Sequence, residues 1–268
     1  MPEPGAFRPK RENVMRQAIL IFWAMWPLFA LPVSGACQTP GRVVLTTLSW
    51  PPYASSALPG GGQSVETVRR ALAATGLTLD AQFYPWKRAV AMALRDPAVQ
   101  GYFPEYYDDG VAVNFLFSEP IGEGPLGFIE RADKPVSWKR LADLKGLRIG
   151  VTLGYVNTAA FDRMAASGEL TADPAVDDAA NVRKLAAGRL DLAVIDLNVF
   201  AYLARPGGGL EKEAEKLRVN PRLLAMRELY VCFRKGPGAE KLAARFNEGL
   251  RRVLDGDAGE ATLTPRTE

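Results

Sequence analysis

The segment Pro85-Trp86-Lys87-Arg88-Ala89-Val90 marks the point where a predicted strand passes into a predicted helix. In residues 77–83, apolar side chains alternate with polar ones, which is typical of a half-buried strand. Proline is favoured at the start of a helix, and Trp86, Ala89 and Val90 then fall on one helical face. A strand followed directly by an amphipathic helix predicts an α/β unit, in which the helix covers a sheet.

The same order of strands and helices recurs along the chain. Strands are predicted at residues 42–48, 77–83, 99–103, 147–152 and 190–195, and helices are predicted after Ser64, after Pro85, after Asn157 or Thr158, and around residues 182–186. A last helix is predicted after residue 234, with Leu242, Phe246, Leu250 and Val253 on one face. Residues 124–131 and 228–234 are predicted crossover segments between two lobes. We expect an α/β protein with mostly parallel sheets, lobe 1 comprising residues 40–125 plus 229–268 and lobe 2 comprising residues 130–225.

The composition is that of a soluble globular protein, and it narrows the possible functions. Hydrophobic residues make up 48% of the 268 residues and charged residues 24%. The net charge of +3 is too small to indicate nucleic-acid binding. The chain contains no histidine, which excludes histidine-based triads, histidine metal ligands and the commonest general base. We therefore expect no metal and no cofactor, whereas carboxylate or lysine catalysis stays open.

The first 36 residues have the pattern of a cleaved signal peptide. Basic residues between positions 8 and 16 precede an apolar stretch at 18–33, and Ser34-Gly35-Ala36 supplies small residues for cleavage. The apolar stretch is shorter than a membrane span and contains Pro27 and Pro32, which favours a signal over an anchor. Met15 would begin a more compact signal. We therefore expect export to a bacterial periplasm.

The two cysteines leave two alternatives open. Cys37 would be the first mature residue, but Ser34 stands where a lipidation signal has an aliphatic residue, so we expect no lipid anchor. An oxidising compartment would allow a disulfide between Cys37 and Cys232. The alternative for Cys232, which lies between Val231 and Phe233, is a buried thiol in a strand.

Five segments together carry a resemblance to a known family. They are Trp50-Pro51-Pro52-Tyr53, the segment at 85–89, Phe117-Ser118-Glu119-Pro120, residues 143–151 and residues 190–196. Their joint order resembles that of the type II periplasmic solute-binding proteins, in the amino-acid-binding branch (bacterial extracellular solute-binding protein family 3). The resemblance extends from about residue 42 to residue 256. It implies a two-lobed fold that closes on a small solute.

The sequence departs from this family at one position that matters for the ligand. Members of the branch usually carry an arginine six residues before the aromatic residue of the Phe-Ser-x-Pro motif, and its guanidinium pairs with the α-carboxylate of the ligand. Here that position is Val111, and the small polar residues usual just upstream are replaced by Pro104, Glu105 and Tyr106. Asp196 occupies the position that accepts the ligand ammonium in relatives. The alternative is that Asp196 caps the following helix, and it could do both.

The resemblance and the predicted strand ends together give a set of candidate ligand-binding residues. They are Trp50, Tyr53, Trp86, Arg88, Phe103, Tyr106, Tyr155, Asn157, Thr158 and Asp196. Aromatic residues at such ends can line a pocket, and the alternative is ordinary packing between loops. Asn157 and Thr158 begin a helix that could receive an anion or could simply be capped by them. Arg88 could reach the cleft or lie exposed on its helix.

These features predict a monomeric periplasmic protein that captures an amino-acid-like or amine solute for an ABC importer. One alternative is a partner that senses its ligand for a membrane receptor. A second is a dehydratase-like enzyme, for which Glu105, Asp108 and Asp109 would supply carboxylates. Because the chain has no histidine and no identifiable acid–base pair, we predict that it is not an enzyme.

Overall fold

The computed structural model describes residues 41–263, with side chains up to Asp257. The predicted signal peptide and Cys37 therefore lie outside the described residues. Within the described part of the chain, none of the helices combines the length and apolar character needed to cross a membrane.

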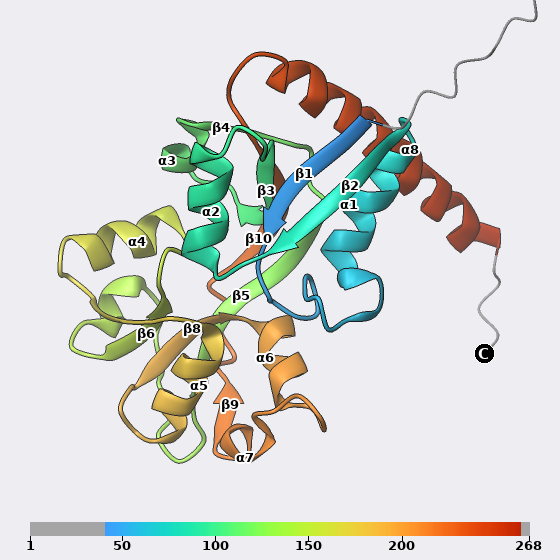
Figure 1. Ribbon diagram of the computed structural model, residues 1–268. Coiled ribbons are helices and arrows are strands. Elements are labelled where there is room, and N and C mark those ends of the chain that lie inside the picture. Colours follow the sequence, from blue (N-terminus) through green and yellow to red (C-terminus); the bar gives the residue numbers. More distant parts are fainter. Residues whose placement is uncertain (1–40, 264–268) are drawn as a thin grey trace, which may run out of the picture. The chain divides into compact units, whose positions relative to one another are not determined.

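Strands and helices alternate through most of the described chain (Figure 1). The strands are β1 (Gly41–Thr47), β2 (Leu77–Phe83), β3 (Gly101–Tyr106), β4 (Phe115–Phe117), β5 (Gly122–Arg131), β6 (Arg148–Thr152), β7 (Thr171–Ala175), β8 (Leu192–Asp196), β9 (Leu217–Val219) and β10 (Ala225–Arg234). The α-helices are α1 (Gln63–Ala73), α2 (Trp86–Arg95), α3 (Asp109–Ala112), α4 (Ala159–Ala166), α5 (Asp178–Ala186), α6 (Leu197–Ala204), α7 (Glu211–Ala214) and α8 (Ala239–Leu263). Short 3₁₀ turns lie at Pro59–Gly61 and Leu141–Leu144.

The sheet has two parallel parts joined by two long antiparallel strands. The strand order is β2-β1-β3-β10-β5-β8-β6-β7. β1 runs parallel to β2 and β3 in the first lobe, and β6 runs parallel to β7 and β8 in the second. β5 and β10 pair with each other antiparallel, and Figure 1 shows β5 running from the part that holds β1 to the part that holds β8. The prediction of two α/β lobes joined by two crossover strands is confirmed.

Several boundaries differ from the sequence predictions, and two of the differences affect the site. β3 continues to Tyr106, whereas its predicted end was residue 103, so Glu105 and Tyr106 belong to a strand. β10 begins at Ala225, not at residue 228, so Arg227 belongs to the crossover. The short strands β4, β7 and β9 were not predicted.

The core of the first lobe includes the amphipathic helix α8, as its apolar spacing predicts. Phe246 and Leu250 are completely buried, and the ring of Phe246 lies 5.5 Å from that of Phe233 on β10. α8 also crosses close to α1. A Cβ atom on Gly249 would lie 1.9 Å from the carbonyl oxygen of Ala71, so this close approach requires glycine.

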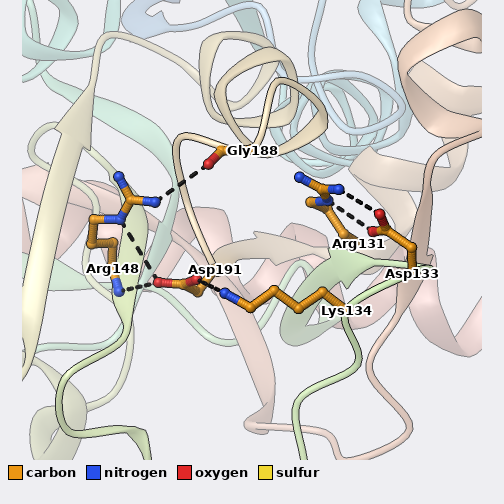
Figure 2. A network of polar contacts seen from close by, with 6 residues as sticks. All are labelled: Arg131, Asp133, Lys134, Arg148, Gly188 and Asp191. Carbon is orange, nitrogen blue, oxygen red and sulfur yellow. Dashed lines mark hydrogen bonds and ion pairs between the residues drawn. The ribbon is translucent and has the colours of Figure 1, made fainter.

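A polar network fixes the end of the second lobe at which β6 and β8 begin (Figure 2). Asp191 accepts hydrogen bonds from Lys134 Nζ at 2.8 Å and from the backbone N–H of Arg148 at 2.9 Å. The guanidinium of Arg148 donates to the carbonyl of Gly188 at 3.3 Å. Parallel strands bind ligands beyond their carboxyl ends, which is the opposite end of these strands. We therefore assign this network to the scaffold of the lobe.

Candidate functional site

The carboxyl ends of the parallel strands bring residues of both lobes to one place. Trp50 follows β1, and Tyr106 is the last residue of β3, both in the first lobe. Thr152 ends β6, and Asp196 ends β8, both in the second lobe. This is the arrangement in which open α/β sheets place their ligands.

A small cavity lies between these strand ends. Its walls are Leu48, Trp50, Trp86, Pro104, Glu105, Tyr106, Tyr155, Val156 and Leu229. Tyr155 and Val156 follow β6 in the second lobe, and most of the other walls belong to the first lobe. The cavity volume of about 20 Å³ leaves room for roughly one water molecule. In this structure the lobes are therefore closed on each other.

Aromatic rings from both lobes contact one another edge to face around the cavity. The ring of Tyr155 lies 6.2 Å from that of Trp50, at 82°, and 5.8 Å from that of Trp86, at 84°. The indole N–H of Trp86 donates to the carbonyl of Gly154 at 2.9 Å, which ties the start of α2 to the second lobe. These contacts place three of the predicted site residues in the wall of one cavity, and Tyr106 is a fourth.

The carboxylate of Asp196 lies beside the cavity and is bound by four donors. It accepts from the backbone N–H groups of Asn198 at 2.9 Å and Val199 at 3.2 Å, so Asp196 caps α6. It also accepts from the hydroxyl of Tyr53 at 3.2 Å and from that of Tyr106 at 3.0 Å. Burial raises the pKa of Asp196, and the hydrogen bond from Tyr106 opposes that rise.

The capping alternative for Asp196 is therefore confirmed, and contact with a ligand ammonium stays a prediction. A carboxylate offers about four acceptor positions, and protein donors occupy them here. An ammonium would have to replace one of the tyrosine hydroxyls, which come from the first lobe. The side-chain amide of Asn198 also donates to the Tyr53 hydroxyl at 2.8 Å and so fixes its direction.

Gly124, on the crossover strand β5, allows the Asp196 cluster to form. A Cβ atom at this position would lie 2.0 Å from Asp196 Oδ2 and 2.6 Å from the Tyr53 hydroxyl. Both distances are shorter than a non-bonded contact permits. Position 124 therefore requires glycine, because any side chain on this part of the crossover strand β5 would clash with the Asp196 cluster.

Asp178, on α5, forms a further hydrogen bond between the lobes, and it was not predicted from the sequence. Its carboxylate accepts from the indole N–H of Trp50 at 3.0 Å and from the hydroxyl of Thr152 at 2.9 Å. Burial raises the pKa of Asp178 to about 6, against the effect of these two hydrogen bonds. The sequence signal that could have indicated Asp178 is the acidic pair Asp177-Asp178 at the start of α5. Asp177 is the residue of the pair that caps the helix.

Glu105, in the wall of the cavity, is a buried carboxyl group with an unusual pKa. It accepts from the hydroxyl of Tyr102 at 3.0 Å and from the backbone N–H of Tyr106 at 2.9 Å. Burial raises its pKa to about 8, because water no longer solvates the charged form. At pH 7 most of this carboxyl is therefore protonated and neutral.

The remaining predicted residues do not line the cavity. Phe103 is completely buried in the core. The guanidinium of Arg88 lies 4.8 Å above the ring of Tyr84. Thr158 caps α4 by accepting from the N–H of Phe161 at 3.2 Å, and the Asn157 amide donates to Asp162 at 2.8 Å. For these residues, contact with a solute stays a prediction.

A wider groove of about 520 Å³ lies outside the cavity at the rim of the cleft. The groove shares Leu48, Trp86 and Tyr155 with the cavity. The contact between the rings of Trp86 and Tyr155 therefore forms part of the wall that separates the groove from the cavity. Val176, at its edge in the second lobe, is 75% exposed although it is apolar. Because Trp86 and Tyr155 belong to different lobes, parting of the lobes would join the groove to the cavity.

Comparison with known proteins identifies the fold. No protein-family model matches the sequence, and no curated protein matches it. A histidine kinase sensor domain with similarity to periplasmic binding proteins superposes with a TM-score of 0.69, at 23% identity, over 83% of this chain and 94% of that one. An ancestral arginine-binding protein bound to arginine gives a TM-score of 0.66, at 17% identity, over 81% and 94%.

A third similar structure is the amino acid ABC transporter substrate-binding protein AbpA from Streptococcus pneumoniae, bound to L-arginine. Its TM-score is 0.64, at 13% identity, over 81% of this chain and 90% of that one. These similarities span nearly the whole of each compared chain. The described residues therefore have the two-lobed type II fold of the periplasmic binding proteins.

Proposed function

We propose that this protein captures a small polar solute, amino-acid-like or amine, between its two lobes and presents it to an ABC importer. The observation that carries the proposal is a cavity whose walls come from both lobes. Trp50, Trp86 and Tyr106 approach it from the first lobe and Tyr155 from the second. A solute held there would contact both lobes at once and would favour the closed form.

Closure would occur about the two crossover strands. We place lobe 1 at residues 40–125 plus 229–268 and lobe 2 at residues 130–225, with β5 and β10 passing between them. Among the described residues, five side-chain hydrogen bonds cross the cleft, namely Trp50 to Asp178, Trp86 to Gly154, Tyr53 to Asp196, Tyr106 to Asp196 and Asn198 to Tyr53. A solute larger than water enters only when the lobes part, and it must offset the bonds that it replaces.

We place the protein in a bacterial periplasm. The support is the basic and apolar pattern of residues 8–36 and the fold, which is shared with periplasmic binding proteins. N-terminal sequencing of the exported protein would locate the cleavage site. A mature chain that still begins at Met1 or Met15 would contradict this assignment.

A thermal-shift screen with amino acids, amines and opines tests the proposal. We expect at least one solute class to raise the melting temperature, because a ligand that binds only the folded state stabilises it. Native mass spectrometry of protein isolated from its own periplasm would reveal a solute that co-purifies. If the complete screen leaves the melting temperature unchanged and no solute co-purifies, the proposed function is wrong.

Two tyrosine variants then locate the binding site. Tyr155→Ala removes the cavity wall that the second lobe supplies, and we expect it to weaken binding at least about tenfold. Tyr202→Ala is the matched control, since Tyr202 lies on α6 and its ring packs beneath Arg205 outside the cavity. Equal affinities of the two variants would place the solute elsewhere.

A second candidate is a sensing role, in which the closed form signals to a membrane receptor. The similarity to a histidine kinase sensor domain favours it. Deletion of the gene distinguishes the two roles. Loss of uptake of the radiolabelled solute supports transport, whereas intact uptake with loss of the transcriptional response to that solute supports sensing.

A further inference from the structure

Arg227 is the feature of the site that the proposed function leaves unexplained. It lies on β10, next to the cavity, and its side chain is half-buried. Its Nη2 donates to the carbonyl of Tyr107 at 2.7 Å, but its Nε is buried without a hydrogen-bond partner. A guanidinium carries five N–H donors and a permanent charge, so an unpartnered buried donor on it is costly.

The register of the crossover strands places Arg227 on the face of the sheet that carries the site. Arg227 pairs directly with Gly124 across β5 and β10. Opposed residues of an antiparallel pair project to the same face, and a Cβ atom on Gly124 would point at Asp196 and Tyr53. Leu229, two residues further along β10 and thus on the same face, is a wall of the cavity.

Tyr106 connects Arg227 to the centre of the site. The guanidinium carbon of Arg227 lies 5.2 Å from the centroid of the Tyr106 ring, whose hydroxyl binds Asp196. The ring of Tyr106 also forms part of the cavity wall. The positive charge therefore lies against one wall of the cavity, and Asp196 lies at the hydroxyl end of the same ring.

The carboxyl groups that lie near Arg227 on neighbouring elements have other hydrogen-bond partners. Glu105, on β3, accepts from Tyr102 and from the N–H of Tyr106. Asp162, on α4, accepts from the backbone and side-chain amides of Asn157. Among residues 41–257, no carboxylate forms an ion pair with Arg227. A half-buried cation in this position lacks its counter-charge.

We propose that Arg227 binds the carboxylate of the captured solute. The inference rests on the proposed function and narrows the solute class to small organic molecules with a carboxylate. Arginine suits this group because its planar fork can donate two parallel hydrogen bonds to it. When the lobes part, Tyr155 and Val156 withdraw from Trp86 and Leu229, and the solute can reach the guanidinium. Closure then buries the new ion pair.

Matched pairs of solutes and variants test this assignment. The probes are L-phenylalanine with 2-phenylethylamine, and L-ornithine with 1,4-diaminobutane; the members of each pair differ only in the carboxylate. Binding is followed by tryptophan fluorescence, to which Trp50 and Trp86 in the cavity wall contribute, and is checked by calorimetry. We expect the carboxylate-bearing member of at least one pair to bind wild-type protein roughly tenfold to a hundredfold more tightly.

Arg227→Gln should remove this preference, leaving the two members within about threefold of each other. Arg227→Lys keeps the charge but loses the fork, and should retain part of the preference. Arg234→Gln is the control, because Arg234 lies on the same strand, is also half-buried and also donates to backbone carbonyls, those of Asp96 and Pro97. We expect Arg234→Gln to behave as wild type.

The outcomes separate this inference from the proposed function. A preference that survives in Arg227→Gln, or a wild-type protein that prefers the amines, overturns the role of Arg227 while solute binding stands. If none of the probes and no solute of the wider screen binds wild-type protein, the proposed function fails and the inference fails with it. Circular dichroism of each variant shows that it is folded, and Arg227→Lys provides the comparison if Arg227→Gln is not.

Discussion

The substitution Gly124→Ala should disrupt the Asp196 cluster without changing any of its functional groups. The added Cβ would lie 2.0 Å from Asp196 Oδ2 and 2.6 Å from the Tyr53 hydroxyl, so the carboxylate must move, and the ring with it. Movement of the carboxylate breaks the hydrogen bonds that Oδ2 accepts from Tyr53 and Tyr106. The two bonds are made to a buried charge, which makes their loss expensive.

The structure sets the size of the expected effect. Hydrogen bonds to charged groups contribute about 1.5–3 kcal/mol each, so loss of two lowers the free energy of unfolding by about 3 kcal/mol or more. For a chain of this length, the melting temperature should fall by about 6–12 °C. Differential scanning calorimetry measures the temperature, and urea unfolding measures the free energy.

A second glycine provides the matched control. Gly256 lies in α8, and a Cβ atom there would meet nothing within 4 Å. Gly256→Ala should therefore leave stability unchanged or raise it by about 0.5–1 kcal/mol, since alanine loses less backbone entropy in a helix. In a Tyr53→Phe background, Gly124→Ala should cost less, because one of the two clashing atoms is absent. A Gly124→Ala protein that melts within about 2 °C of wild type would refute the reasoning.

Three further predictions concern the buried and exposed carboxyl groups. Because the folded pKa of Glu105 is about 8, above its usual value, its contribution to stability is complete at low pH and is lost as pH rises through 8. Glu105→Gln should therefore flatten the decline in unfolding free energy between pH 5 and 9, and an unchanged slope in urea titrations would contradict this. Trp50→Phe removes a hydrogen-bond donor from Asp178 and should lower the free energy of unfolding by about 1.5–3 kcal/mol at pH 8. The loss should be smaller at pH 5, where Asp178 is mostly protonated. Equal losses at both pH values would count against this prediction. Asp191→Asn breaks the network of Figure 2, whose cations are largely exposed. It should lower the free energy of unfolding by no more than about 1 kcal/mol and leave solute binding intact. Weakened binding would show that this end of the lobe takes part in the site.

Elements with strong side-chain periodicity could be predicted closely from the sequence. The alternation in residues 77–83 gave β2 with its observed bounds, and the apolar face of the last helix gave α8. β7 was missed, because Asp173 and Pro174 disfavour strands. It is the last strand of the sheet, where a proline is tolerated since one side of the strand has no partner. Position in the sheet, which the local sequence does not encode, decided this case.

The aromatic part of the site was predictable, whereas two of its charged residues, Asp178 and Arg227, were not. Strand ends and the family resemblance placed Trp50, Trp86, Tyr106 and Tyr155 near one another, and all four line the cavity. The bond from Trp50 to Asp178 joins residues 128 positions apart, in different lobes. It depends on how the lobes meet, and no local pattern at either residue indicates that.

Arg227 shows why a fixed spacing is an incomplete test for a ligand anchor. The predicted return strand began one residue later, at Glu228, which left Arg227 in a loop with no defined direction. A strand fixes the direction of each side chain by its register, and a shift of one residue reverses the face. In the structure β10 passes between β3 and β5, so a side chain from β10 can reach the wall that β3 forms with Tyr106. The proposed anchor is thus supplied from β10, whereas position 111 lies on α3, and the sheet order is what reveals β10 as the neighbour of β3.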